Sequence, residues 1–192
     1  VDTYFSKTVA EFEKLHEVPD HSEVCLWFEH DLFCQANRWF VLSLLAERTN
    51  LQVFSVDPPL KDGAHTWEGF GVATTEGLQT AYASRQQLTT EDLQLGADLW
   101  AAFQQQDLAA LKALSASKSP NFPFLESVVQ AHLGRFSTDQ NLGRPERAVQ
   151  AILNGQNLPF ETVFSEFSQR EGIYGFSDLQ IKKIYNQHIN RH

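Results

Sequence analysis

The densest group of reactive side chains follows an apolar run near the start of the chain. Glu29, His30 and Asp31 are consecutive, and Gln35 and Arg38 follow Asp31 at helical spacing. A carboxylate beside an imidazole can act as a general base and its orienting partner. So many polar groups interrupting an apolar region are as consistent with a functional site as with plain packing. We therefore identify Glu29, His30 and Asp31 as candidate catalytic residues and Gln35 and Arg38 as ligand-binding residues.

The hydrophobic pattern around this group predicts the elements that position it. The continuous apolar run 24–28 predicts a buried strand, residues 32–48 predict a helix, and residues 51–56 predict a second strand. Strand, helix and strand in this order favour a parallel pair joined by a right-handed crossover. In open α/β sheets, ligands bind outside the carboxyl ends of the strands, and a helix start offers free N–H groups to an anion. This arrangement predicts a site for a small anionic or nucleotide-like ligand, with any cofactor unknown.

Each of these residues also has a structural interpretation. Asp31 would be the N-cap of the following helix and Arg38 its solvated neighbour. His30 would be a partly buried imidazole with satisfied hydrogen bonds. His132 is a further ligand-binding candidate, but it lies on an apolar helical face, where a core or interface histidine is the alternative. Both interpretations stay open on the sequence alone.

The second half of the chain shows helical periodicity throughout. A polar, turn-rich segment at 115–120 predicts a boundary between an α/β domain at 1–116 and a helical domain at 117–192. Three short helices with tight connections resemble a helix-turn-helix arrangement, with Lys182 and Lys183 facing outward as candidate nucleic-acid-binding residues. A plain helical bundle with solvated lysines fits the same pattern.

Charge divides the chain into unequal halves. The 192 residues carry a formal net charge of −9, with 42% hydrophobic residues. Residues 1–100 hold 16 acidic and 6 basic side chains, whereas residues 101–192 hold 8 and 9. An acidic chain excludes a protein that coats nucleic acid generally, and only the second half remains compatible with a DNA contact.

The sequence lacks the signals that mark several classes of protein. No apolar stretch approaches the roughly 20 residues that a bilayer span needs, and the first residues show no signal-peptide pattern. We therefore expect no membrane partner and a cytoplasmic location. Cys25 and Cys34 are expected to be buried thiols in a reducing compartment, and two cysteines are too few for a structural zinc site. We predict no metal site, and the oligomeric state stays unknown.

Five segments together resemble a known family. They are 26–35, 88–93, 122–125, 132–138 and 175–179. They look like the corresponding segments of bacterial proteins that carry domain of unknown function 1835, and they span nearly the whole chain. Two departures stand out. The family usually reads Arg-Asn-Gly-Leu where residues 139–142 read Asp-Gln-Asn-Leu, and its opening strand with an Asn-Gly-Asp-Ser-Leu-like motif is missing here. The absence of Met fits a family member without its first α/β segment.

The resemblance implies a fold class but no activity. It implies an α/β fold in which a partial, Rossmann-like parallel sheet layer precedes a mostly helical, winged-helix-like domain. Our main hypothesis is that the α/β domain binds a small anionic ligand at Glu29, His30 and Asp31, with processing of that ligand left open. The second is a ligand-sensing regulator whose C-terminal domain binds DNA, and the third is a protein-interaction scaffold with an acidic front face.

Overall fold

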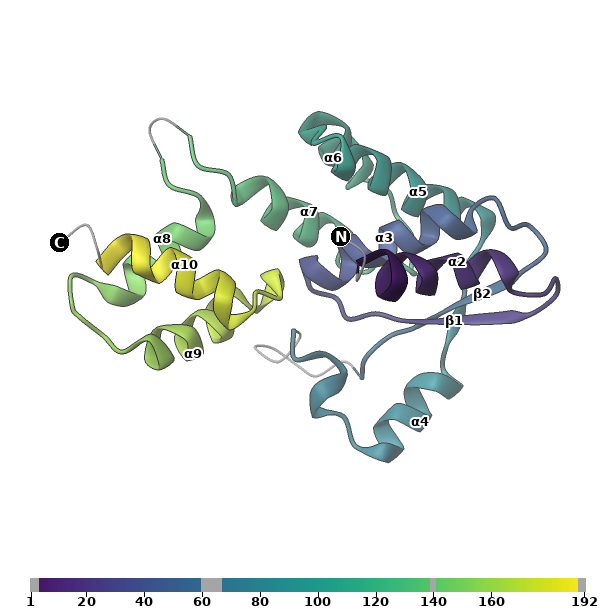
Figure 1. The fold of residues 1–192 in the computed structure, drawn as a ribbon, viewed down its shortest axis with the longest axis horizontal. Helices are drawn as coiled ribbons and strands as arrows, with labels where there is room; N and C mark the ends of the chain where they lie inside the picture. Colours follow the sequence, from purple (N-terminus) through teal and green to yellow (C-terminus); the bar gives the residue numbers. More distant parts are fainter. Residues whose placement is uncertain (1–3, 60–66, 139–140, 190–192) are drawn as a thin grey trace.

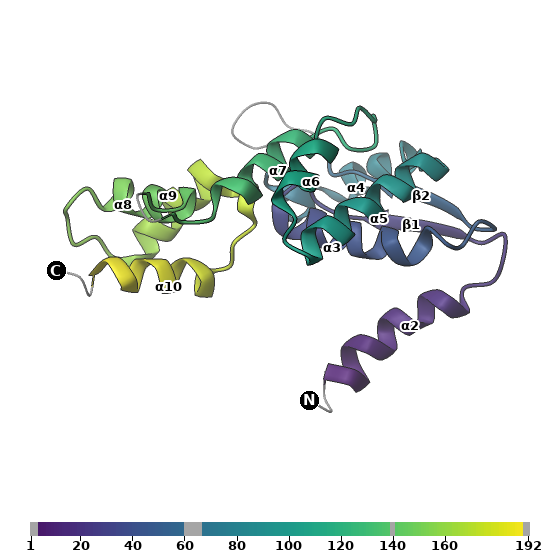
Figure 2. The same cartoon turned by 90° about the horizontal axis from the view of Figure 1, so that it is seen from above.

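The computed structural model describes residues 4–59, 67–138 and 141–189. The fold is mixed α/β and mostly helical, with two lobes side by side (Figure 1). The first lobe contains the sheet and its covering helices, and the second is a bundle of three helices. Figure 2 shows the same two lobes from above, with α2 extending away from the first. The α/β expectation is confirmed at this level.

The sheet has three strands in the described part of the chain. β1 (Glu23–Trp27) pairs in parallel with β2 (Gln52–Val56), and α3 (Leu32–Leu45) connects them. β3 (Gln86–Gln87) pairs antiparallel with β2, which makes β2 the central strand. The predicted strand–helix–strand unit is therefore confirmed, and the carboxyl ends of β1 and β2 lie beside each other.

One face of the sheet is covered by the main apolar core. α3 packs along α5 (Thr90–Gln104), which continues through α6 (Leu108–Leu114) into α7 (Leu125–Gly134). The two long helices approach closely because Gly96 of α5 lies directly against the Leu42 side chain. The largest fully buried apolar side chains of this layer are Trp39, Leu42, Leu45, Leu99, Leu111, Val53 and Val128. Burial of these side chains orients the polar line on α3 relative to the sheet.

Shorter elements border the sheet at its other face and end. They are the 3₁₀ turn η3 (Gly69–Val72) and α4 (Thr75–Ala83). Before β1 a π-helical turn, η1 (Phe5–Val9), runs into α2 (Ala10–Glu17). Arg48 ties the end of α2 to the body, because its guanidinium donates to the carbonyls of residues 15, 16 and 18.

The second lobe consists of α8 (Arg144–Leu153), α9 (Phe160–Glu171) and α10 (Asp178–Ile189), which pack on one another. A 3₁₀ turn, η4 (Gly172–Tyr174), follows α9 and contacts both α3 and α7. The Tyr174 hydroxyl donates to the carbonyl oxygen of Ala131 at 3.0 Å, which fixes the lobes at this junction.

The predicted boundary at residues 116 and 117 places α7 in the second domain. In the structure α7 packs against α3 and α6 of the first lobe, and the chain enters the three-helix bundle only after Gly134. None of the described residues that follow Gly134 belongs to a β-strand, so the bundle carries no wing of paired strands there. No helix in the described ranges combines the length and the apolar character that a membrane crossing requires.

Candidate functional site

The three consecutive ionisable residues after β1 do not point the same way. Glu29 and Asp31 lie together where the chain bends into α3, with ligand atoms of Glu29, Asp31 and Cys34 all within 4.8 Å of one another. His30 has separate contacts, with its ring 4.8 Å from that of Phe124. Among the described residues no hydrogen bond joins the Nε2 atom of His30 to a carboxylate, so the expected base-and-orienter pair is not formed through this atom.

Glu29 anchors the turn that follows the loop after β2. Its Oε1 accepts the backbone N–H of Phe70 at 2.8 Å. Gly69 has a φ of +65°, and a Cβ atom there would overlap the Glu29 carboxyl group. Only glycine combines this backbone conformation with so close an approach. The Glu29 carboxylate is thus committed to holding η3 against the end of β1.

Asp31 is the N-cap of α3, as the structural interpretation predicted. Its Oδ1 accepts the backbone N–H of Cys34 at 3.0 Å. One turn along, the side chain of Gln35 donates to the Glu29 carbonyl oxygen at 2.7 Å. Asp31 also contacts the second lobe, because a Cβ on Gly175, which has a φ of +60°, would overlap Asp31 Oδ1. Asp31 and Gln35 therefore brace the junction between strand, helix and second lobe.

The contact between Asp31 and Gly175 leads to a stability prediction. We expect Gly175→Ala to lower the free energy of unfolding by about 3 kcal/mol or more, since strain and overlap with Asp31 add together. Gly155 is the matched control: its φ is +72°, but nothing lies within 4 Å of an added Cβ. Gly155→Ala should therefore cost only about 1 kcal/mol from the backbone. Urea denaturation measures both, and equal losses would show that the Asp31 contact adds nothing.

Glu29, Asp31 and Cys34 also form the one group of metal-compatible ligand atoms found in the described residues. Burial raises the pKa of the Cys34 thiol to about 12, and the neighbouring Asp31 carboxylate contributes. A thiol binds a metal as thiolate, so Cys34 would have to lose its proton to act as a ligand. Cys25 and Cys34 are both unpaired, as expected, but they are half-buried rather than buried.

Arg38, on α3, lies in an environment that differs from the one expected from the sequence. Its side chain is 1% exposed, so the interpretation of Arg38 as a solvated neighbour of the N-cap is wrong. Its Nε and Nη2 atoms have no hydrogen-bond acceptor, and the guanidinium carbon lies 4.6 Å from the centre of the Phe122 ring. Burial lowers the pKa of Arg38. The negative charges of Asp57 and Asp92 oppose this shift, although neither carboxylate forms an ion pair with Arg38. A buried guanidinium with unmatched donors calls for an acceptor.

His30 has the same character as Arg38. It is 3% exposed, and its Nε2 atom has no hydrogen-bond partner, so the imidazole is buried but not satisfied. Burial lowers the pKa of His30; the carboxylates of Asp57 and Asp31 oppose this shift, and the charge of Arg38 adds to it. Arg38 and His30 thus share Asp57 as a neighbouring negative charge.

Two carboxylates near Arg38 were missed by the sequence analysis. Asp57 directly follows β2 and accepts from the buried Ser55 hydroxyl at 3.0 Å. The rule that ligands gather at the carboxyl ends of parallel strands points to Asp57 as strongly as to His30. Asp92 lies in the first turn of α5, at the N3 position of a capping box. It accepts from Thr89, from the Ser119 hydroxyl and from the Asn121 amide. Nothing in its local sequence signals that it lies near Arg38.

The remaining candidates lie elsewhere. His132 is 2% exposed on α7, with Phe103 and Phe136 ring centres at 4.8 and 5.2 Å, and neither of its nitrogens has a partner. Its surroundings are those of a core histidine, and its ligand role stays a prediction. Lys182 and Lys183 are exposed on α10, with the Lys182 ammonium 5.4 Å from the Phe160 ring centre. Their role in DNA binding likewise stays a prediction.

Comparisons with protein-family models, with curated proteins and with solved structures returned no match to this chain.

Proposed function

We propose that the protein binds a small anionic ligand at the carboxyl ends of β1 and β2, in a Rossmann-like strand–helix–strand unit. One observation carries this proposal: the guanidinium of Arg38 is almost fully buried while Nε and Nη2 lack an acceptor. An isolated buried charge costs several kcal/mol, roughly, unless a partner compensates for it. A phosphate or carboxylate group would supply two acceptor oxygens in the geometry that a guanidinium fork matches.

The surroundings of Arg38 support a small ligand. His30 contributes a second buried polar atom without a partner, and Ser55 and Asp57 border the group from the end of β2. Phe122 and Phe124, from the segment before α7, pack against Arg38 and His30. Because both polar residues are buried, we propose a ligand of the size of a phosphate group, admitted by local opening of this segment. His30 would hydrogen-bond the ligand, and Glu29 and Asp31 would support the framework.

The proposal is tested by thermal unfolding of the chain in inorganic phosphate, with potassium chloride at matched ionic strength. We expect the unfolding temperature to rise with phosphate concentration; a ligand at 100 times its Kd adds about 2.7 kcal/mol. Phosphate also stabilises proteins without binding, by exclusion from their surface. The Arg38→Met variant separates the two effects. It should lose the saturable rise in unfolding temperature, which comes from binding, and keep the rise that comes from exclusion.

Arg38→Lys is the second variant, since it keeps a positive charge but loses the planar fork. We expect it to bind phosphate more weakly than the wild type, and isothermal titration calorimetry measures the difference. A saturable response of the same size in the wild type and in Arg38→Met would overturn the proposal, as would the absence of any saturable response in the wild type.

A further inference from the structure

A buried amide oxygen lies next to the proposed anion site at Arg38 and His30. Asn121 is 5% exposed, and its Oδ1 atom has no hydrogen-bond partner among the described residues. Its Nδ2 atom donates to Oδ2 of Asp92 at 2.7 Å and to the carbonyl oxygen of Gln87 at 3.4 Å. Because both of these neighbours are acceptors, they fix which end of the amide is the nitrogen. Asn121 therefore leaves an acceptor that calls for a donor.

Asn121 and Arg38 are connected through two neighbours. The ring of Phe122, the next residue, packs on Arg38, with the guanidinium carbon 4.6 Å from the ring centre. Asp92, the acceptor of the amide, is one of two carboxylates whose charges oppose the lowering of the pKa of Arg38 by burial; the other is Asp57. The unmatched donors of Arg38 and the unmatched acceptor of Asn121 therefore lie in the same part of the first lobe.

Asp57 adds carboxylate oxygens from the end of β2. Its Oδ1 accepts from Ser55 at 3.0 Å, and its charge also opposes the lowering of the pKa of His30 by burial. A ligand between these groups would meet donors on Arg38 and acceptors on Asn121 and Asp57. Sulfate carries no proton at neutral pH, so a sulfate oxygen that faced an acceptor would leave that acceptor without a hydrogen bond. Hydrogen phosphate has the same tetrahedral shape and carries a P–OH group that can donate.

We propose that the site selects inorganic hydrogen phosphate over sulfate, a selectivity that rests on the proposed function. The unprotonated oxygens of the ligand accept from the Arg38 guanidinium, and its P–OH group donates to Oδ1 of Asn121. One ligand thus pairs the unmatched atoms of both side chains. A site that holds a buried hydrogen-bonding group for a ligand hydroxyl rejects an analogue that lacks the hydroxyl.

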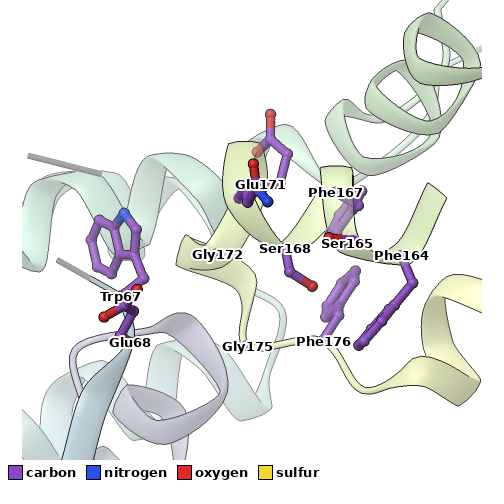
Figure 3. A pocket seen from close by; sticks show the side chains of 11 residues that line it. Trp67, Glu68, Phe164, Ser165, Phe167, Ser168, Glu171, Gly172, Gly175 and Phe176 are labelled. Atoms are coloured by element: carbon purple, nitrogen blue, oxygen red, sulfur yellow. The ribbon is translucent and has the colours of Figure 1, made fainter. Parts of the chain in front are cut away.

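The approach to this site differs from the space between the lobes. A cavity of about 380 Å³ is lined by Asp92 and Asn121, so an anion can approach Asn121 from there. A larger cavity, of about 810 Å³, lies between the two lobes, with Trp67 on one side and Phe176 on the other (Figure 3). Neither Arg38 nor Asn121 lines this larger cavity, so phosphate binding should not depend on it.

Titration of the full chain with phosphate and with sulfate tests this inference. In isothermal titration calorimetry at matched ionic strength, we expect phosphate to bind at least about tenfold more tightly than sulfate, because a buried acceptor without a donor costs that factor or more. Methyl phosphate is the third ligand. Its second pKa is roughly 6, so at a pH of about 8 it has lost the proton that inorganic phosphate keeps, and it should bind more weakly.

Two variants locate the selectivity. Asn121→Leu removes the acceptor from a side chain of similar size, and it should reduce the preference for phosphate over sulfate by about threefold or more. Ser168→Phe fills the cavity between the lobes from an exposed position, and it should leave both affinities as they are in the wild type. The comparison in the wild type needs no variant, so it decides even if Asn121→Leu does not fold.

The selectivity and the proposed function would fail in different ways. Equal affinities for phosphate and sulfate, both lost in Arg38→Met, would overturn the selectivity and retain the anion site. Methyl phosphate that bound as tightly as inorganic phosphate at a pH of about 8 would do the same, as would an unchanged preference in Asn121→Leu. The absence of saturable phosphate binding would overturn both.

Discussion

Replacing Arg38 by methionine should raise the free energy of unfolding by about 1–3 kcal/mol, although it removes the longest polar side chain in the core. The guanidinium is 1% exposed, and two of its nitrogen atoms have no acceptor. Methionine has a similar length and flexibility, so it can fill the same space against Phe122 without a charge to desolvate. Urea denaturation in chloride buffer measures the gain.

Arg48 serves as the control, because its guanidinium has the hydrogen-bond acceptors that Arg38 lacks. Its guanidinium donates to the carbonyl oxygens of Leu15, His16 and Val18 at 2.9, 3.0 and 2.6 Å. Arg48→Met should therefore lower the free energy of unfolding by about 1–3 kcal/mol, because three acceptors lose their donor. If both variants were destabilised alike, the longer-range attraction of Asp57 and Asp92 would have to outweigh the burial of Arg38. A bound anion would then no longer be needed to compensate the buried guanidinium.

A second large effect concerns acid stability. Burial lowers the pKa of His132 to about 4, and the charge of Arg135 contributes. In the unfolded chain a histidine titrates near a pKa of roughly 6.5. At pH values between these two pKa values, His132 is protonated in the unfolded state but neutral in the folded state. The contribution of His132 to stability is therefore complete above a pH of about 6.5 and is lost as the pH falls towards about 4. The loss amounts to about 3 kcal/mol. His30, whose pKa is also lowered, changes stability in the same direction.

His132→Leu should remove most of this loss. Leucine fits between Phe103 and Phe136 and leaves no unpaired nitrogen, so the variant should gain more over the wild type at a pH of about 4.5 than at about 8. Carboxylates contribute to acid unfolding in both proteins, and the difference between the two stability–pH curves isolates His132. His16→Leu, at an exposed position on α2, is the control for the substitution itself. Parallel curves for His132→Leu and the wild type would contradict the prediction.

The stability and binding predictions for Arg38 are linked. A side chain that destabilises the fold but binds a ligand is typical of a functional site, where stability and activity oppose each other. Arg38→Met is expected to be the more stable protein in chloride and the less responsive one in phosphate. A structural arginine would show neither change, since its replacement would lower stability and leave the phosphate response intact.

The local elements could be predicted from the sequence because their causes are local. The apolar runs before Glu29 and around Val53 predicted the two strands that pair in parallel, because strands of parallel sheets typically read as continuous apolar runs. Asp31 was recognisable as an N-cap from its place before an apolar helix. Pro145 in the first turn and Asn154 at the end of α8 likewise mark the limits of that helix in the sequence.

The sequence by itself determined which residues are polar and where they follow a strand, but only the tertiary structure decided what each one meets. The bend between β1 and α3 places Glu29 and Asp31 against two glycine turns distant in sequence and places His30 against Phe124. Arg38 is buried because α3 turns that face towards the sheet and the segment before α7, a long-range contact that no local pattern reports. The cavity beside Trp67 arises in the same way, since its walls come from chain segments roughly 100 residues apart that meet only when the lobes pack.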